Sequence, residues 1–178
     1  MNTKLKLDEL NRVSLEEFKN KAKHPVTIVL DDIRSLNNIG TFFRTGDAFC
    51  VEKIILCGIT AQPPHREIQK TALGATESVD WEYIEKAENA VLKLQNENVK
   101  VYAVEQTSNS ISLEKFEQKE DKIALIFGNE VNGVQQNVID ICNGSIEIPQ
   151  FGTKHSFNVS VSAGIVLWEV IKKIALKK

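Results

Sequence analysis

The chain has 178 residues, of which 42% are hydrophobic and 26% are charged, and its formal net charge is −2. These values are typical of one globular domain and argue against a disordered or fibrous protein. No apolar run approaches the roughly 20 residues that a membrane-spanning helix needs, so we expect no membrane segment and a cytoplasmic location. The three cysteines, Cys50, Cys57 and Cys142, are far apart in apolar surroundings and predict buried thiols in a reducing compartment.

The amino-terminal residues 1–24 predict a lysine-rich helical arm, with an amphipathic helix over 5–23 and a capping box at Ser14–Glu17. The run "PVTIVLDD" (25–32) predicts a buried strand. The next segment, "NNIGTFFRTGDAF" (37–49), predicts a helix with an asparagine as its cap. Further strands are predicted, from apolar runs bounded by turn residues, at 51–58, 99–106, 122–130 and 145–150. Further helices are predicted at 63–74, 85–98 and 134–142, followed by a last helix that begins at Ser156–Asn158.

Strands that alternate with helices predict an α/β fold with a mainly parallel sheet and helices on both faces. No repeat, low-complexity tract or linker divides the sequence, so we expect a single domain over 1–178. In such folds ligands bind beyond the carboxyl ends of the strands. Here the strands run into "DDIRSLNNIGTFFR", "VEQT", "FGNEVNG" and "IPQFGTKHSFN", which predicts a convergent polar site for a small molecule.

The common cofactor loops are missing. The sequence has no G-x-G-x-x-G after a strand and no G-x-x-x-x-G-K-[ST], which disfavours dehydrogenases, P-loop NTPases and Rossmann-type methyltransferases. His24, His65 and His155 are scattered without partners at metal-ligand spacing, so we expect no metal site. A hydrolase built on Ser156 and His155 is disfavoured, because adjacent residues seldom face each other and no G-x-S-x-G elbow is present.

The stretch "GTKHSFNVSVSAGIVLWEV" (152–170) combines small polar residues with an apolar run. The simpler interpretation is a core helix whose serines bond back to the backbone. Packing accounts well for Val159, Val161, Ile165 and Leu167. It accounts poorly for Asn158, because a buried amide needs partners to avoid a cost of roughly 1–3 kcal/mol.

Three separated stretches resemble the motifs of the SpoU/TrmH class of RNA 2′-O-ribose methyltransferases, within the SPOUT superfamily. The first is "NNIGTFFRTGDAF", with Asn38 and Arg44 at the family's spacing. The second is "LIFGNEVNGV", which matches F-G-x-E-x-x-G, and the third is "IEIPQFGTKHSFNVSVSAGIVLWE". The resemblance covers nearly all of residues 25–172, and three motifs in order at compatible spacing are very specific.

This resemblance implies an α/β core (25–178) whose carboxyl-terminal part forms a trefoil knot. It also implies a homodimer, with the last helix in the interface that completes each active site, where Ser160, Ser162, Ala163 and Gly164 would permit close helix packing. The implied cofactor is S-adenosylmethionine, bent within the knotted loops. By position, Glu105 ends a strand near the cofactor and Gly128 leaves room for it. Ile148 and Phe157 would supply apolar walls and backbone hydrogen bonds to the adenine.

The resemblance implies catalytic roles for Arg44, Asn38, Glu130, Ser156 and Asn158. Arg44 matches an arginine often assigned as general base, although a guanidinium with a pKa above ~12 serves more naturally as a phosphate clamp and charge stabiliser. In that role Arg44 would share the removal of the 2′-hydroxyl proton with a substrate phosphate. Asn38 would position Arg44 or the RNA, and Glu130 would orient Arg44 or a neighbouring backbone group. The alternative for Glu130 is a carboxylate favoured at a helix amino terminus.

The implied substrate is tRNA or rRNA, which a net acidic protein must contact through local basic groups. Our candidates for RNA contact lie in loops near the same edge of the sheet, together with the arm: Arg34, His65, Arg66, Lys70, Lys154 and His155. Clustered lysines at the two chain ends, Lys172 and Lys173 among them, fit either RNA contact or a solvated face. Two other functions stay open, a non-catalytic SPOUT-fold RNA-binding module and a base methyltransferase of the same superfamily.

Overall fold

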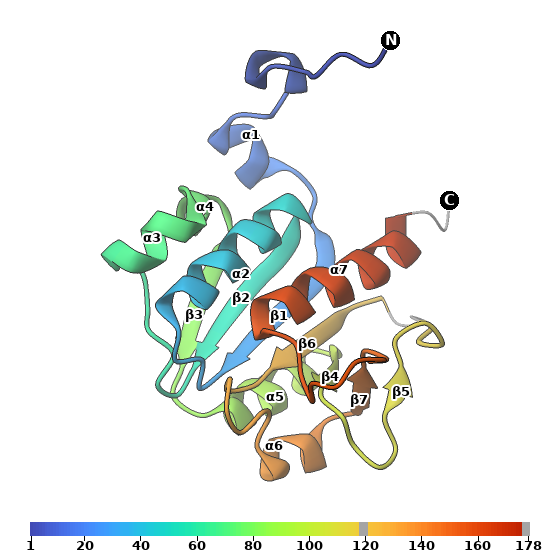
Figure 1. The fold of residues 1–178 in the computed structure, drawn as a ribbon. Coiled ribbons are helices and arrows are strands. Elements are labelled where there is room, and N and C mark those ends of the chain that lie inside the picture. Colours follow the sequence, from blue (N-terminus) through green and yellow to red (C-terminus); the bar gives the residue numbers. More distant parts are fainter. Residues whose placement is uncertain (118–120, 176–178) are drawn as a thin grey trace.

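Seven strands form one sheet in the computed structural model of the protein, which describes residues 1–117 and 121–175 (Figure 1). The strands are β1 (His24–Asp31), β2 (Val51–Cys57), β3 (Asp80–Ile84), β4 (Lys100–Val104), β5 (Ile111–Ser112), β6 (Ile123–Phe127) and β7 (Gly144–Glu147). Their order is β3-β2-β1-β6-β4-β7-β5, and every neighbouring pair is parallel. The predicted α/β class and parallel sheet are confirmed.

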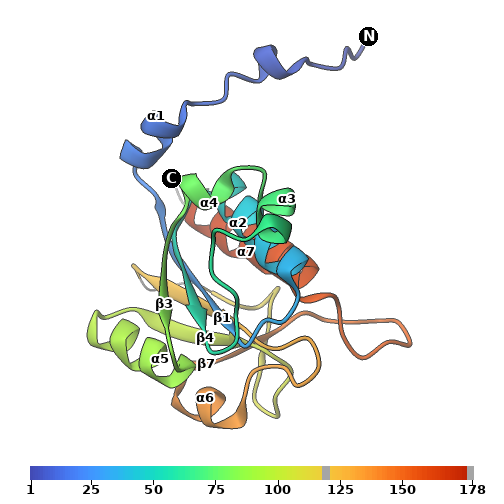
Figure 2. The ribbon, with the colours of Figure 1, turned by 90° about the vertical axis from the view of Figure 1, so that its left-hand side faces the viewer.

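Helices cover both faces of this sheet (Figure 2). One face carries α2 (Leu36–Ala48), α3 (Arg66–Ala72), α4 (Ala75–Ser78) and α7 (Val159–Ala175), and the other carries α5 (Ala87–Asn96) and α6 (Gln136–Ile141). Along β1, Ile28 and Leu30 pack into the core cluster on the α2 and α7 side, whereas Val29 packs into the cluster on the α5 and α6 side. A strand buried on both faces is apolar throughout, which is why the sequence identifies β1.

The amino-terminal arm projects from the sheet and differs from its prediction (Figures 1 and 2). Instead of one helix over 5–23, the chain forms η1 (Leu7–Leu10) and α1 (Leu15–Asn20). The break occurs because Asn11 takes the left-handed conformation, with φ 47°. The predicted capping box is confirmed, since Ser14 Oγ accepts from the Glu17 N–H at 3.2 Å and Glu17 Oε2 accepts from the Ser14 N–H at 2.7 Å.

The edge strand β3 was not predicted from the sequence. Its five residues include Asp80 and Glu82, and none of the five is buried. An edge strand without a buried face lacks the apolar alternation on which strand prediction depends.

The order of the central strands determines where the predicted ligand site lies. β6 lies between β1 and β4, so their carboxyl ends are neighbours although β1 is about a hundred residues from β6 in sequence. The segments that follow these strands therefore meet at one edge, where ligands bind in open α/β sheets.

Two of the three thiols, Cys50 and Cys57, are buried as predicted, and all three are free. No helix in the described part of the chain combines the length and apolarity needed to cross a bilayer.

Candidate active site

A cavity of about 640 Å³ opens at this edge, where β4, β6 and β7 end and α7 begins. Its walls come from residues 104–106, residues 127–133 and the segment that joins β7 to α7. Seven of the nine predicted site residues line it, namely Glu105, Gly128, Glu130, Ile148, Ser156, Phe157 and Asn158. These seven residues come from the second and third motifs and, for Glu105, from the end of β4, whereas Asn38 and Arg44 of the first motif do not line the cavity.

Glu130 joins the segment after β6 to the start of α2. Its Oε2 accepts from the Arg34 N–H at 3.0 Å, and its Oε1 accepts from the Ser35 N–H at 3.0 Å and from Asn38 Nδ2 at 2.9 Å. Burial raises the pKa of Glu130, but these three hydrogen bonds outweigh burial and hold the pKa below its usual value. Of the two predicted roles for Glu130, the structure supports the orientation of backbone groups, not of Arg44.

Asn38 extends this network to the first turn of α7. Its Oδ1 accepts from Asn158 Nδ2 at 3.2 Å and from Ser160 Oγ at 3.3 Å. Asn38 is 8% exposed, so its polar atoms have exchanged water for these partners. The chain Glu130–Asn38–Asn158 thus links all three sequence motifs.

Three local predictions around this network were wrong. The cap of α2 is Ser35, whose Oγ accepts from the Asn38 N–H at 3.3 Å, so Asn38 is free to face the network. The helix α7 begins at Val159, which leaves Ser156 in the preceding loop. Asn158 was expected to be buried, but it is exposed at the cavity rim, where its Oδ1 caps α7 by accepting from the Ser160 N–H at 2.9 Å.

Glu105 and two glycines shape the floor of the cavity. Glu105 Oε2 accepts from the Val134 N–H at 3.0 Å, and its Oε1 accepts from the Gln106 N–H at 3.0 Å. A Cβ on Gly128 would lie 2.1 Å from the carbonyl carbon of Gly133, and a Cβ on Gly133 would lie 2.2 Å from Glu105 Oε2. At Gly128 the opposing atoms are backbone, so a side chain does not fit there, whereas Gly133 has φ 67° and faces the flexible Glu105 side chain.

The charge of the cavity indicates what it can hold. Glu105, Glu130 and Glu147 line it, and no Lys or Arg of the described residues does. Ile148 and Phe157 add apolar surface. This lining disfavours a phosphate-bearing ligand and suits one with a positive charge and an apolar ring.

Arg44 does not reach this cavity within one chain. It is exposed on α2, where its spacing from Asn37 and Ala48, both also exposed, places it on the outer face of the helix. Beside it α7 exposes an apolar stripe, with Val161 51% and Trp168 60% exposed. The Trp168 ring lies 6.4 Å from the Phe49 ring at the end of α2.

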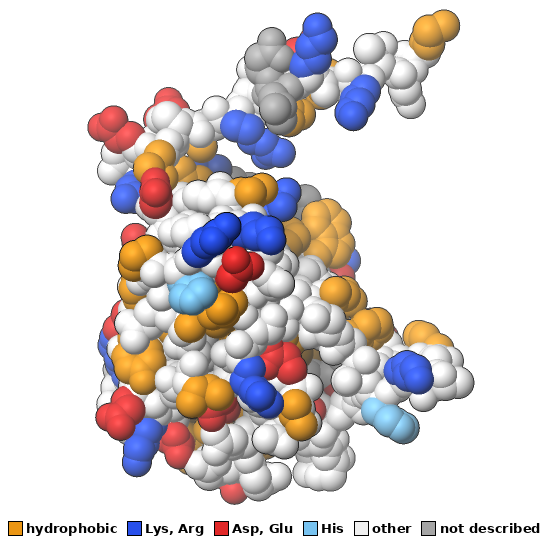
Figure 3. Space-filling view, turned by 60° about the vertical axis from the view of Figure 1, so that its left-hand side comes forward, with side chains coloured by type: hydrophobic (Ala, Val, Ile, Leu, Met, Phe, Trp, Pro, Cys, Tyr) orange, Lys and Arg blue, Asp and Glu red, His pale blue; other side chains and the backbone are white. Residues whose placement is uncertain are grey.

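The predicted RNA-contact residues are all exposed: Arg34, His65, Arg66, Lys70, Lys154 and His155. Figure 3 shows basic side chains over α3 and others on a projecting segment, which corresponds to the loop before α7 in Figure 2. Phe151 on this loop is 97% exposed. Gln106, unlike its neighbour Glu105, was not singled out from "VEQT", yet its Nε2 donates to the His155 carbonyl at 3.1 Å and ties the loop to the end of β4.

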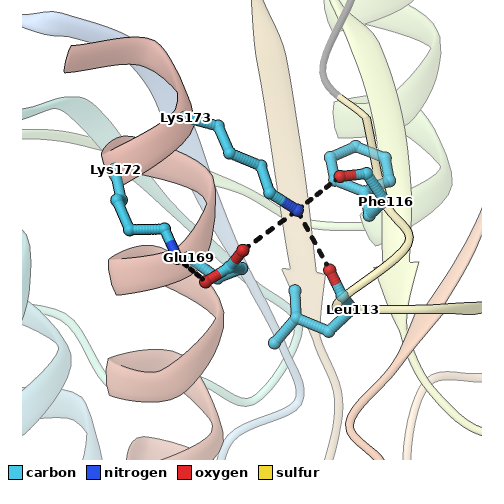
Figure 4. Close-up of polar contacts among 5 residues, drawn as sticks. All are labelled: Leu113, Phe116, Glu169, Lys172 and Lys173. Carbon is cyan, nitrogen blue, oxygen red and sulfur yellow. Dashed lines mark hydrogen bonds and ion pairs between the residues drawn. The ribbon is translucent and has the colours of Figure 1, made fainter. Parts of the chain in front are cut away.

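The basic cluster near the end of α7 has a structural role (Figure 4). Lys173 Nζ donates to the carbonyls of Leu113 at 3.3 Å and Phe116 at 2.6 Å, and lies 3.1 Å from Glu169 Oε1. Lys172 Nζ lies 2.6 Å from Glu169 Oε2. Lys173 therefore fastens the segment after β5 to α7, whereas Lys172 pairs with Glu169 on its own helix.

Comparison with known proteins adds independent information. Residues 25–168 match the sequence profile of the SpoU rRNA Methylase family. The chain is 30% identical over 168 residues to the 23S rRNA (guanosine-2'-O-)-methyltransferase RlmB of Neisseria meningitidis, covering 94% of this chain and 66% of that relative. It is 30% identical over 159 residues to the tRNA (guanosine(18)-2'-O)-methyltransferase of Aquifex aeolicus, covering 87% of this chain and 72% of that one.

Solved structures give a consistent result for the fold. The crystal structure of the SpoU methyltransferase AviRb from Streptomyces viridochromogenes in complex with AdoMet superposes with a TM-score of 0.79 at 17% identity. The match covers 91% of this chain and 62% of that one. The chain thus spans about two thirds of the length of these rRNA and AviRb relatives.

Proposed function

Because the chain belongs to the SpoU rRNA methylase family, we propose that it transfers a methyl group from S-adenosylmethionine to a ribose 2′-hydroxyl of tRNA or rRNA. The observation that carries the proposal is the acidic cavity at the sheet edge, bordered by the Glu130–Asn38–Asn158 network. Relatives that match over most of this chain are named as enzymes that modify a guanosine 2′-oxygen in either RNA.

The residues of the cavity fit the cofactor. Three glutamates and no Lys or Arg line it, an environment that favours a sulfonium cation over a phosphate. Gly128 and Gly133 bring bare backbone to the floor, and Ile148 and Phe157 provide apolar surface for an adenine. The cofactor supplies an electrophilic methyl group on positively charged sulfur.

The protein's part is alignment and proton removal. The rim residues would orient a ribose 2′-hydroxyl toward the methyl group that a bound cofactor would supply, and a substrate phosphate held by Arg44 would take the hydroxyl proton. Alignment of the oxygen with the methyl carbon and sulfur contributes roughly 7–11 kcal/mol in favourable cases. Asn38, Asn158 and Ser156 hold the rim where the ribose enters, and Glu130 fixes the turn between β1 and α2 beside it.

A homodimer would supply the missing arginine. Arg44 lies on the outer face of α2, and the neighbouring helix α7 exposes Val161 and Trp168. Pairing of two such faces buries both stripes and carries Arg44 of the partner subunit toward the cavity. There the guanidinium clamps a substrate phosphate and stabilises charge at the reacting oxygen.

Trp168→Glu tests this interface. We expect the variant to be monomeric by light scattering at concentrations where the wild type is dimeric, because a buried tryptophan contributes on the order of 2 kcal/mol or more to an interface. Methyl transfer should fall with dimer content. Leu92→Glu is the matched control, since Leu92 is 50% exposed on α5, on the other face of the sheet. A dimeric Trp168→Glu protein would contradict this interface.

The domain that we propose comprises a helical arm (1–24) and a core (25–178) with a carboxyl-terminal trefoil knot. Two side chains support the knot, because each ties together two segments that the knot would bring side by side. Gln106 Nε2 bonds the His155 carbonyl on the loop before α7, and Lys173 bonds the Leu113 and Phe116 carbonyls. Free thiols fit a reducing compartment, so we assign the activity to the cytoplasm.

RNA would approach across the face between α3 and the loop before α7, where the six exposed basic candidates lie. Phe151 on this loop exposes its whole ring beside Lys154 and His155, an arrangement suited to stacking on an unpaired base with phosphates nearby. We assign these RNA-contact roles from the positions of the residues and from their charge.

Phe151→Ala tests the stacking. We expect RNA affinity to fall by about 1–3 kcal/mol, the usual value of one stacked base, with no change in affinity for S-adenosylmethionine. Phe151→Trp should restore RNA affinity, because it keeps an aromatic face. Filter binding with the RNA substrate measures both variants, and unchanged binding by Phe151→Ala would remove Phe151 from the RNA interface.

The proposed function itself is tested by mapping 2′-O-methylated positions in total RNA from cells with and without the gene. We expect at least one position in tRNA or rRNA to lose its methyl group and to regain it with the wild-type gene. Identical maps in the two strains would contradict the proposal.

A further inference from the structure

Three glutamates line the cavity, and the chain's own backbone occupies two of them. Each oxygen of Glu105 accepts from a backbone N–H, and so does each oxygen of Glu130. Glu147, at the end of β7, differs from both. Its Oε2 accepts from the Ser110 hydroxyl at 2.9 Å, and its Oε1 has no hydrogen-bond partner among the described residues. Glu147 therefore provides the cavity with a carboxylate oxygen that is available to a ligand.

Contacts with β5 and with the turn before it hold Glu147 in place. Its backbone carbonyl accepts from the Leu113 N–H at 2.9 Å, where β5 and β7 run in parallel. The Ser110 N–H donates to the Thr107 carbonyl at 3.3 Å, which closes the turn that presents the Ser110 hydroxyl. Thr107 Oγ1 lies 2.5 Å from Ser145 Oγ on β7 and ties the same turn to that strand. The chain itself therefore orients the Glu147 side chain.

The residues on either side of Glu147 are apolar. Ile146 and Ile148 both line the cavity, together with Val104 and Phe127. Such a surface suits the flat face of an adenine ring. A carboxylate between these residues lies within reach of the ribose, because the ribose is the group bonded directly to the base. The two ribose hydroxyls are donors, and a carboxylate accepts from them more strongly than a neutral group does.

We propose that Glu147 is a cofactor-binding residue whose Oε1 accepts from the ribose hydroxyls of S-adenosylmethionine, and that Ser110 is its positioning residue. This assignment rests on the proposed function, since it concerns the same cavity. It gives the three glutamates different tasks. Glu105 and Glu130 hold backbone groups of the cavity wall, whereas Glu147 holds the ligand.

Glu147→Gln is the first test, because it keeps the size of the side chain and removes its charge. We expect the Kd for S-adenosylmethionine to rise about tenfold, as is usual when a hydrogen bond to a charged group is weakened. Calorimetry with 5′-methylthioadenosine should show the same factor, because this neutral analogue keeps the adenosine and lacks the amino-acid group. A loss confined to S-adenosylmethionine would place Glu147 beside the ammonium or the sulfonium and would overturn the assignment.

Glu114→Gln is the matched control for net charge. Glu114 is exposed just after β5 and does not line the cavity, so the variant removes the same charge from outside the site. We expect wild-type affinity for both ligands. If Glu114→Gln weakened binding as much as Glu147→Gln does, overall charge would explain the effect and the assignment of Glu147 would be wrong.

Removal of the hydroxyls from the ligand gives the complementary test. The wild type should bind 5′-methylthioadenosine about tenfold more tightly than its 2′,3′-dideoxy analogue, whereas Glu147→Gln should discriminate much less. A residue with a purely structural role would weaken the two ligands equally. Equal discrimination by the wild type and the variant would therefore overturn the assignment.

Ser110→Ala tests the positioning residue and does not change the glutamate itself. We expect the Kd for S-adenosylmethionine to rise about threefold, the usual effect of one lost hydrogen bond. Ser110→Thr should restore affinity, because it keeps the hydroxyl. Ser110→Ala should add little to the loss in Glu147→Gln, since both act through one carboxylate. Additive losses would contradict the role of Ser110.

The wild type separates failure of this assignment from failure of the proposed function. Wild-type affinity for S-adenosylmethionine that Glu147→Gln leaves unchanged would overturn only the assignment of Glu147. A wild-type protein without affinity for S-adenosylmethionine would contradict the proposed function itself.

Discussion

Arg44→Ala is expected to lower kcat/KM for RNA by roughly 10²–10³-fold, the usual loss when one group that stabilises transition-state charge is removed. Affinity for S-adenosylmethionine should stay within a few fold, because Arg44 does not line the cavity of its own chain. The dimer should persist as well. The assay is initial-rate methyl transfer to RNA, with cofactor binding measured separately on the same preparation.

Two further variants show whether the loss of kcat/KM is specific to the guanidinium of Arg44. Arg44→Lys keeps the charge without the planar fork, so we expect it to recover only part of the activity if phosphate is held in a bidentate manner. Lys100→Ala removes an exposed cation at the start of β4, at the opposite edge of the sheet, and should be fully active. Full activity of Arg44→Ala would show that the arginine has no catalytic role.

Gly128→Ala is expected to weaken S-adenosylmethionine binding by at least about tenfold, with destabilisation of about 1–3 kcal/mol. An added Cβ would lie 2.1 Å from both the carbonyl carbon of Gly133 and the amide nitrogen of Val134. Both are backbone atoms, so segment 129–134 must move, and that segment is the cavity wall. Isothermal calorimetry and thermal unfolding measure the two effects.

Gly144→Ala is the control for Gly128→Ala. It adds the same methyl group at the start of β7, where the nearest atom is a Tyr102 side-chain carbon at an ordinary 3.4 Å. We expect unchanged cofactor affinity. Wild-type affinity in Gly128→Ala would mean that the cofactor does not depend on this wall.

The sequence predicted the central part of the fold well, because buried strands such as β1 are apolar throughout and are followed by abrupt polar turns. It did not predict β3, whose Asp80 and Glu82 replace the apolar pattern at the sheet edge. It also merged η1 and α1 into one helix, since a left-handed residue such as Asn11 is not marked by composition. The first error arises from the position of β3 at the sheet edge, and the second from the local backbone conformation of Asn11.

The sequence offered candidate residues for the site, but it did not show which of them would contact one another. The resemblance of the three motifs to the SpoU/TrmH family singled out Glu130, Asn38 and Asn158, but their mutual hydrogen bonds span 92 and 120 residues and depend on the strand order. Glu130 was expected to orient Arg44 or a backbone group, but the sequence did not show that its partners would be the N–H groups of Arg34 and Ser35. Asp31 was predicted only as the polar end of a strand, because its burial depends on elements distant in sequence that pack over the sheet.

Transfer of labelled methyl groups tests the central claim most directly. The wild-type protein is incubated with methyl-labelled S-adenosylmethionine and RNA from cells that lack the gene, and the RNA is then digested to nucleosides. We predict that the label is recovered in a 2′-O-methylated nucleoside. Label in a methylated base would indicate a base methyltransferase, and binding of RNA without any transfer would indicate a non-catalytic module. Either result would contradict ribose 2′-O-methylation at this cavity.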